Sequence, residues 1–395
     1  MRGKRMLSVA EAHRRVIDLI VPQPPETVAL TAAAGRVLLA DIVATRAQPP
    51  FAASAMDGYA VRAADAAEGA GLRVVATAAA GHAWSGTLGQ GEAVRIFTGA
   101  PVPQGADAIL IQEDADRDGD RITVRAAPAP GAFIRPAGLD FTAGVRVTAP
   151  RRLTPRDIAL IAAMGVPAVQ VARRPVVALL PTGDELVTPG SAPQPDQIFA
   201  SNSYGLAARI AEAGGVPRLI PPAADTPEGL LTALAEARGA DIIVTLGGAS
   251  VGDHDLVARV FGEAGLDLGF HRIAMRPGKP LMAGRIGPVA MLGLPGNPVS
   301  AMVCGELFLL PAIARALGLA GERPAARPVP LASPIPANGP REHYMRARSI
   351  EGRIEVAEDQ DSSRLGILAE ADGLVVRAPH APAAAAGEPV DYIPL

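Results

Sequence analysis

The sequence predicts a multidomain α/β and β protein, in which a central α/β domain with a mostly parallel sheet is accompanied by smaller β domains. From Pro175 onward, apolar runs of strand length alternate with helical segments, as in a parallel sheet covered on both faces. Residues 61–140 instead hold short apolar runs separated by Gly and Pro, which is typical of a small β domain. A Pro-rich segment, 322–333, resembles a linker, and short strand-like runs follow it to Leu395.

The N-terminal half is expected to begin with helices and continue with strands. Ser8 and Glu11 match a helix-capping box, and a second short helix is expected over Thr31–Leu39. Turn residues around Asp57 and Gly58 precede a strand. The expected strands of the small β domain are Leu72–Ala76, Ala93–Phe97, Ala108–Gln112 and Arg121–Arg125.

The C-terminal half carries the alternating pattern. Helices are expected at Thr154–Met164, Asn202–Ala213, Thr226–Ala237, from Asp255 onward, and from Pro298 to near Gly318. The strands expected between and after them are Val176–Leu180, Val216–Ile220, Ile242–Leu246, Leu268–Met275 and Val289–Leu292. Those of the C-terminal region are His343–Ser349, Arg353–Val356, Gly373–Val376 and Pro389–Tyr392.

Composition narrows the class of protein. The 395 residues carry a net charge of −3, which is not the basic footprint of a nucleic-acid-binding protein. No apolar run reaches the ~18 residues of a membrane span, and no signal peptide opens the chain. The one cysteine, Cys304, excludes an intrachain disulfide and is expected in the core. A soluble cytoplasmic protein is therefore expected.

One Gly-rich turn follows the apolar run Ile242–Leu246. Gly247 and Gly248 let the backbone approach a ligand closely and expose N–H groups. Ser250, Asp253 and Asp255 come next and lead into an apolar-periodic helix. A strand end, a glycine turn and a helix start together favour a phosphate, although such a turn can also be purely structural.

A second Gly-rich turn, Leu294–Ser300, strengthens the phosphate interpretation. It contains Gly296, then Asn297 as the expected helix cap, then Pro298 at the first helical position. Because strand ends in a parallel sheet meet at one edge, the two turns are expected to line one crevice.

Four carboxylates and two cations accompany these turns. Asp184, Glu185, Asp253 and Asp255 supply the hard oxygen ligands that Mg²⁺ prefers, and each could instead stabilise a helix start. Arg276 and Lys279 supply positive charge for an oxyanion. No Walker A motif, Rossmann fingerprint or catalytic triad is present, so metal-assisted handling of an anionic small molecule is favoured.

The motifs resemble those of the molybdopterin molybdenumtransferase family, and are similar to the E domain of gephyrin. The resemblance covers nearly the whole chain, in order, in six motifs: Ser54–Ala60, Phe97–Pro103, Thr182–Leu186, Gly247–Asp253, Arg276–Pro280 and Leu294–Ser300.

The resemblance implies four domains and a homodimer. These are an extended N-terminal domain (1–45 plus 141–173), an inserted β domain (46–140), a molybdopterin-binding α/β domain (174–321) and a C-terminal β domain (322–395). It also implies a reaction: adenylylated molybdopterin and molybdate react with Mg²⁺, AMP leaves, and molybdenum stays on the dithiolene sulfurs. Contacts with the molybdopterin adenylyltransferase and with molybdoenzyme apoproteins are further implied.

Residue by residue, the resemblance carries functional roles to positions in every domain. These are Asp57, Thr98, Asp140, Glu185, Asp225, Asp255, Arg276, Lys279, Pro295, Pro298 and Arg346. Ser300 is added for molybdate because a helix N-terminus binds anions.

Three positions depart from the family pattern. Arg276 stands where Lys is more usual, Leu246 where Ser is usual, and Leu139 where Glu is common. Two alternative functions stay open: molybdopterin adenylyltransferase, which the extra domains disfavour, and a non-catalytic scaffold like gephyrin, which the retained carboxylates and Lys279 disfavour.

Overall fold

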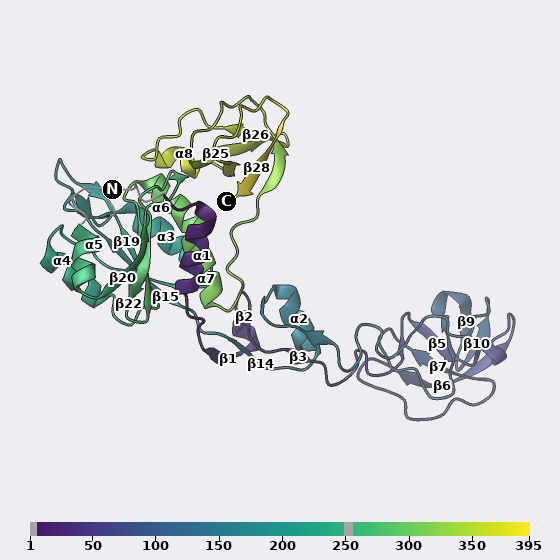
Figure 1. The fold of residues 1–395 in the computed structure, drawn as a ribbon. Coiled ribbons are helices and arrows are strands. Elements are labelled where there is room, and N and C mark those ends of the chain that lie inside the picture. The colour runs from purple at the N-terminus through teal and green to yellow at the C-terminus, as the bar shows by residue number, and fades with distance from the viewer. Residues whose placement is uncertain (1–5, 249–255) are drawn as a thin grey trace.

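The chain folds into an elongated molecule with its domains in a row (Figure 1). The computed structural model describes residues 6–248 and 256–395. The α/β domain and the C-terminal domain lie together at one end, and the inserted β domain lies at the other. An extended domain of paired chain segments joins them, so the multidomain α/β and β architecture is confirmed.

The α/β domain is built on a mixed sheet of six strands in the order β18-β15-β19-β23-β22-β20. Four neighbouring strands are parallel, and β22 runs antiparallel to both of its neighbours. Their bounds are β18 Val216–Leu219, β15 Val176–Pro181, β19 Ile242–Leu246, β23 Val289–Leu294, β22 Met282–Ile286 and β20 Leu266–His271. The prediction of a mostly parallel sheet is confirmed.

Helices cover both faces of this sheet, as its strand pattern predicts. On β19, Ile242, Val244 and Leu246 enter one core and Ile243 enters the other. One face carries α1 (Val9–Leu19), α3 (Ser201–Glu212), α6 (Pro298–Cys304) and α7 (Leu310–Ala316), and the other carries α4 (Pro227–Glu236) and α5 (Leu256–Glu263). Although α1 opens the chain, it packs on the α/β core.

A π-helical turn, Gly305–Leu309, joins α6 to α7 in one continuous run. By length and composition, Pro298–Ala316 could cross a membrane, contrary to the expectation that no apolar run is long enough. However, 78% of its most apolar window is buried, as in the core helix of a globular protein. Cys304 is buried in this run, as predicted.

One prediction for the α/β domain is wrong, and one strand was not predicted. Leu268–Met275 is not one strand: β20 ends at His271, and the separate β21 (Met275–Arg276) joins another sheet. Arg272, with a φ of 116°, turns the chain between them. Strand β22 was missed because Gly284 weakens its pattern; a Cβ there would lie 2.3 Å from the Asp267 carbonyl oxygen.

The extended domain pairs an outgoing segment with a returning one. Its sheet has the order β1-β14-β2-β13 (Pro25–Ala29, Ala168–Ala172, Val37–Leu38, Arg151–Arg152), β3 (Ile42–Val43) pairs with β12 (Arg146–Val147), and α2 is Pro155–Ala163. The helix predicted over Thr31–Leu39 is wrong. A short 3₁₀ turn, Leu30–Ala32, and β2 replace it, because Gly35 with a φ of 75° breaks the run.

The inserted β domain has six strands in the order β8-β5-β7-β6-β10-β9. Their bounds are β8 Ala108–Ile111, β5 Gly58–Val61, β7 Glu92–Ile96, β6 Gly71–Ala78, β10 Arg121–Val124 and β9 Ala115–Asp118, and β4 (Ala53–Ser54) pairs with β11 (Ile134–Arg135). The four predicted strands are confirmed. Strand β9 was missed because its polar sequence has little strand propensity.

The C-terminal sheet has the order β21-β25-β27-β28-β24, with β26 on β25. Its strands β25 (Glu342–Ile350), β26 (Arg353–Val356), β27 (Gly373–Arg377) and β28 (Pro389–Pro394) confirm the predicted ones. Part of the predicted linker is strand β24 (Arg327–Pro330); it pairs only with β28, and such an edge tolerates proline. The short helix α8 (Leu365–Ala369) was not predicted.

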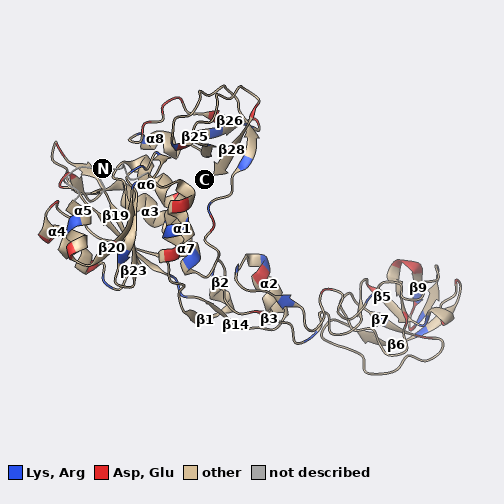
Figure 2. Cartoon of the chain, viewed as in Figure 1, with Lys and Arg blue, Asp and Glu red and all other residues tan. Residues whose placement is uncertain are grey.

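Charges of both signs are interspersed over the helices of the α/β domain (Figure 2). At the junction between the α/β domain and the extended domain, charged side chains form specific contacts. Arg173 binds Asp241 (Nη2–Oδ1 2.6 Å), and Asp241 also accepts from the Val176 amide (2.7 Å). On the outgoing segment, the Gln23 amide donates to the Ala316 carbonyl oxygen (2.7 Å), so both crossing points are tied to the α/β domain. Arg152, within the extended domain, adds a bond to the carbonyl oxygen of Ala213 (2.8 Å).

The start of α2 makes a testable contribution to stability. Asp157 Oδ2 accepts from the amide and the hydroxyl of Thr154 (both 2.8 Å), and these bonds, the amide foremost, hold the Asp157 pKa below its ordinary value. Asp157→Ala should therefore lower the stability of α2 by about 1 kcal/mol at pH 7. A depressed pKa gives stability above the ordinary pKa of ~4 that is lost as pH falls, so the difference should shrink toward pH 3.

Hydrogen exchange of the α2 amides at both pH values measures this difference. The matched control is Glu228→Ala, since Glu228 lies in the first turn of α4 and makes no side-chain hydrogen bond to the described residues. Equal α2 exchange in the Asp157 variant and wild type at pH 7 would contradict the assignment.

Candidate active site

A cavity of about 610 Å³ lies at the carboxyl edge of the parallel strands β15, β19 and β23. It collects predicted site residues from three separate motifs. These are Glu185, Asp225, Gly247, Gly248, Pro295, Gly296, Asn297 and Pro298. The structure therefore brings both Gly-rich turns into one crevice.

The two turns touch, and the first of them admits only glycine. The Gly247 amide donates to the Leu294 carbonyl oxygen (3.1 Å), Gly247 has a φ of 100°, and a Cβ on it would lie 2.8 Å from the Thr182 carbonyl oxygen. Gly248 has a φ of 65°, and a Cβ on it would lie 2.2 Å from Val257 Cγ2. The backbone is thus left bare toward the cavity, as phosphate binding requires.

Three carboxylates gather at one side of this cavity. The Asp225 amide donates to Asp184 Oδ1 (3.0 Å), and Glu185 lines the cavity beside Asp225. Burial, with repulsion from Asp184 and Glu185, raises the pKa of the Asp225 carboxyl above its ordinary value. Within residues 6–248 and 256–395, no set of three or more metal-ligating side chains is arranged around one point. Ser250, Asp253 and Asp255 lie outside the described residues, so the metal assignment stays a prediction.

The mouth of the cavity includes residues that the sequence did not reveal. Strand β17 (Ile198–Phe199) pairs with β16 (Leu186–Val187), and Phe199 lines the cavity. Asn202, at the start of α3, donates from Nδ2 to the Gly296 carbonyl oxygen (2.7 Å). Ser363 reaches the cavity from the C-terminal domain. No local pattern marks these residues, since each acts across a long sequence separation.

The start of α6 differs in detail from the prediction. Asn297 occupies the cap position, but its side chain makes no capping bond and donates to Ser362 Oγ (2.8 Å) instead. Ser362 also accepts from the Val299 amide (3.1 Å). Ser300 is buried and does not line the cavity.

The loop of Arg276 and Lys279 runs beside this cavity. Pro280 lines it, whereas Arg276 lines a separate cavity of about 450 Å³ with His343 and Arg377 of the C-terminal domain. Burial, with nearby Arg276, lowers the His343 pKa to about 4, so that imidazole is neutral at pH 7. Lys279 is half-buried, and its carbonyl oxygen accepts from the Ile273 amide (3.0 Å).

Arg346 lies inside the C-terminal domain and is only 1% exposed. Its guanidinium donates to the carbonyl oxygens of Asp359, Asp361 and Arg364 (2.8–3.3 Å) and to the side chain of Gln360. In this structure Arg346 holds the loop that carries Ser362 and Ser363.

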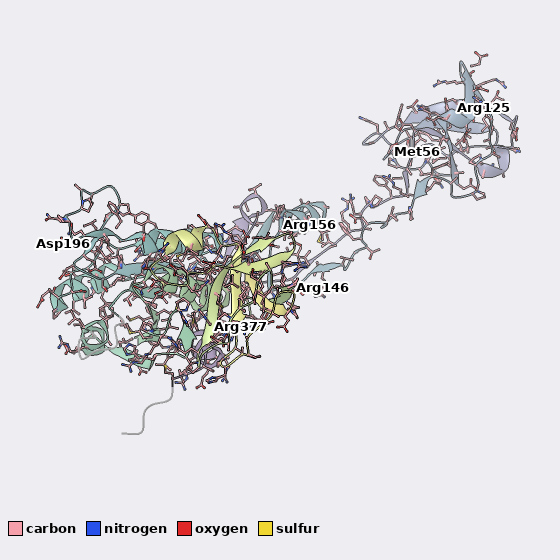
Figure 3. The ribbon with its side chains drawn as sticks, turned by 90° about the horizontal axis from the view of Figure 1, so that it is seen from above. Met56, Arg125, Arg146, Arg156, Asp196 and Arg377 are labelled. Carbon is pink, nitrogen blue, oxygen red and sulfur yellow. The ribbon has the colours of Figure 1, made fainter. Side chains whose placement is uncertain are left out.

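Asp57, Thr98 and Asp140 lie far from the α/β cavity in the same chain. Asp57 Oδ1 accepts from the amide and hydroxyl of Thr98 (both 2.8 Å), and these bonds, the amide foremost, lower the Asp57 pKa. Figure 3 shows neighbouring Met56 in the inserted domain, at the opposite end from Asp196 and Arg377. Asp140 is exposed, and its amide donates to the Gln48 carbonyl oxygen (3.0 Å).

Comparison with known proteins agrees with this architecture. Residues 7–165 match the MoeA N-terminal region (domain I and II), residues 178–315 match a probable molybdopterin binding domain, and residues 328–395 match the MoeA C-terminal region (domain IV). The crystal structure of a molybdopterin biosynthesis MoeA protein from Pyrococcus horikosii superposes with a TM-score of 0.85 at 30% identity and covers 99% of both chains.

Two bacterial relatives are similar over most of their length. The molybdopterin molybdenumtransferase of Nostoc sp. is 39% identical over 392 residues, covering 94% of this chain and 90% of the relative. That of Bacillus subtilis is 33% identical, again over 94% of this chain and 90% of the relative. On sequence, on domain content and on fold, this chain belongs to the molybdopterin molybdenumtransferase family.

Proposed function

We propose that this enzyme inserts molybdenum from molybdate into adenylylated molybdopterin, releasing AMP and producing molybdenum cofactor. Family membership supports the reaction class. The observation that carries the assignment to a site is the pairing of two bare glycine turns with the carboxylates Glu185 and Asp225 in one cavity of the molybdopterin-binding domain.

The described residues suit a substrate that carries phosphates. The Gly247 amide is bonded to the Leu294 carbonyl oxygen, which leaves the amides of Gly248 and Gly296 to face phosphate oxygens. The phosphoanhydride between molybdopterin and AMP would lie over these turns, and its cleavage by water frees AMP. Molybdate is the second substrate, and its molybdenum ends on the two dithiolene sulfurs. Arg276 and Lys279, beside the cavity, are the cations proposed for these oxyanions.

The carboxylate group also fits the expected Mg²⁺. Burial, together with repulsion from Asp184 and Glu185, raises the pKa of Asp225, and a divalent cation relieves that repulsion. We assign Asp225 and Glu185 as ligands, with the remaining positions left to substrate oxygens and water. When bound, Mg²⁺ neutralises phosphate charge.

We further propose a cytoplasmic homodimer with composite active sites. Asp57 is ionised and held by Thr98, yet the inserted domain that carries it lies at the opposite end of the molecule from the α/β domain, which carries Glu185 (Figure 1). A two-fold dimer could place the inserted domain of each chain over the α/β cavity of its partner.

The first test concerns the acidic group. Asp225→Asn should keep the fold, lower AMP release at least tenfold, and raise the Mg²⁺ concentration needed for half-maximal rate, because one negative ligand is lost. In wild type, the raised Asp225 pKa means that protons compete with Mg²⁺ at a higher pH than for an ordinary carboxyl, so this Mg²⁺ requirement should rise as pH falls.

The assay measures AMP release from purified protein given adenylylated molybdopterin, molybdate and Mg²⁺. Asp196→Asn is the matched control, because Asp196 is exposed and does not line the cavity. Wild-type rate and Mg²⁺ dependence in the Asp225 variant would refute the metal assignment.

The second test concerns the composite site. Asp57→Ala and Glu185→Ala homodimers should each be inactive, because one lesion falls in every site. Refolding the two variants together gives hybrids in which one site carries both lesions and the other carries none. With random pairing, about half of the dimers are hybrids with one intact site each, so roughly a quarter of wild-type activity should return.

Differently tagged chains and a double pull-down establish that hybrids have formed. If confirmed hybrids release no AMP, Asp57 and Glu185 serve the same site within one chain, and the composite arrangement is excluded.

A further inference from the structure

An exposed phenylalanine lines the mouth of the acidic cavity. Phe199 is 45% exposed, and its neighbour Ile198 is 59% exposed. Of the described residues that line this cavity, Phe199 alone has an aromatic ring. A single exposed apolar side chain needs no explanation, but two together at the edge of a binding cavity do.

The backbone holds this ring firmly beside the acidic loop. The Ile198 amide donates to the Glu185 carbonyl oxygen (2.8 Å), and the Ala200 amide donates to that of Val187 (2.9 Å). These bonds fix Phe199 at the end of β17, where it pairs with Val187, two residues before α3 begins at Ser201. The ring is therefore displayed on an ordered backbone, next to one of the proposed metal ligands.

The cavity lining thus contains two chemically distinct sets of residues. The glycine turns and the carboxylates Glu185 and Asp225 are polar, whereas Leu186, Ile198 and Phe199, next to Glu185, form an apolar lip. A ligand that joins a charged phosphate to a flat heterocycle matches both sets. Aromatic side chains bind such rings by stacking.

We propose that Phe199 is a substrate-binding residue whose ring stacks on a planar heterocycle of the substrate. This inference rests on the proposed function and adds to it the group that the apolar lip recognises. Pterin and adenine share the required chemistry, and binding measurements distinguish them.

Titration calorimetry on the full chain tests the proposal without turnover. The probes are AMP, neopterin (a pterin lacking the dithiolene) and ribose 5-phosphate, which carries the sugar and phosphate of AMP but no heterocyclic base. Phe199→Ala should weaken binding of AMP, of neopterin or of both by about tenfold, and should leave ribose 5-phosphate unchanged. Loss for AMP alone assigns adenine, and loss for neopterin alone assigns pterin.

Two variants serve as controls. Phe199→Trp should keep the affinity, and its fluorescence should be quenched by the heterocycle that stacks on it; the wild-type chain has a single tryptophan, Trp84. Tyr204→Ala removes a ring that is 43% exposed on α3 but does not line the cavity, and should bind all probes as wild type does.

The proposal is overturned if Phe199→Ala binds both heterocycles as tightly as wild type, or if wild type binds neither at millimolar concentration. It is also overturned if the variant changes the oligomeric state by light scattering while binding is unaltered, since the ring would then be a subunit contact. AMP release by wild type in these cases would leave the proposed function standing.

Discussion

The close contact between two glycine turns is the constraint on which the rest of the site depends. Strands β19 and β23 are neighbours in the sheet, so the turns that follow them must share one narrow space. The Gly247 amide is bonded to the Leu294 carbonyl oxygen, and a Cβ on Gly247 or Gly248 would clash with Thr182 or Val257. Because side chains are excluded there, the cavity floor is backbone, and its chemistry must come from the surrounding loops. Those loops supply carboxylates and, beside Glu185, an apolar lip.

The C-terminal domain completes this cavity through a loop that it holds from within. Arg346 is almost fully buried, and its guanidinium binds three carbonyl oxygens of the segment 359–364. That segment then meets the start of α6, where Ser362 contacts both Asn297 and the Val299 amide. Strand β21 adds a second connection, since Arg276 belongs to the α/β loop but pairs with β25. The two domains are therefore one structural unit around the site, although a Pro-rich segment separates them in sequence.

Sequence alone predicts the parts of this structure whose signals are local. Apolar runs locate β15, β19 and β23, and the glycine turns and nearby acids locate the cavity, because strand ends in a parallel sheet share an edge. Predictions failed where tertiary pairing overrode local pattern: β2 pairs with returning strands, β22 contains a glycine, and β24 tolerates proline at an edge. Asn202, Ser363 and Phe199 could not be found because their contacts span long separations or depend on exposure. Arg346 was assigned a role by the family resemblance alone, and nothing local in the sequence predicts that its side chain is buried inside the C-terminal domain.

The inserted domain carries Asp57, which lies far from the α/β cavity of its own chain. The chain crosses out of the α/β domain and back again, and the Gln23–Ala316 and Arg173–Asp241 contacts secure the two crossings. The paired strands beyond them make a spacer rather than a free tether. Asp57 is meanwhile ionised, held by Thr98 and left accessible at the surface. Within its own chain, Asp57 holds the loop of Thr98 and meets none of the described residues that line the α/β cavity. In the proposed two-fold dimer, Asp57 would face the substrate in the partner's cavity, and the spacer would set the distance between the two halves of one active site.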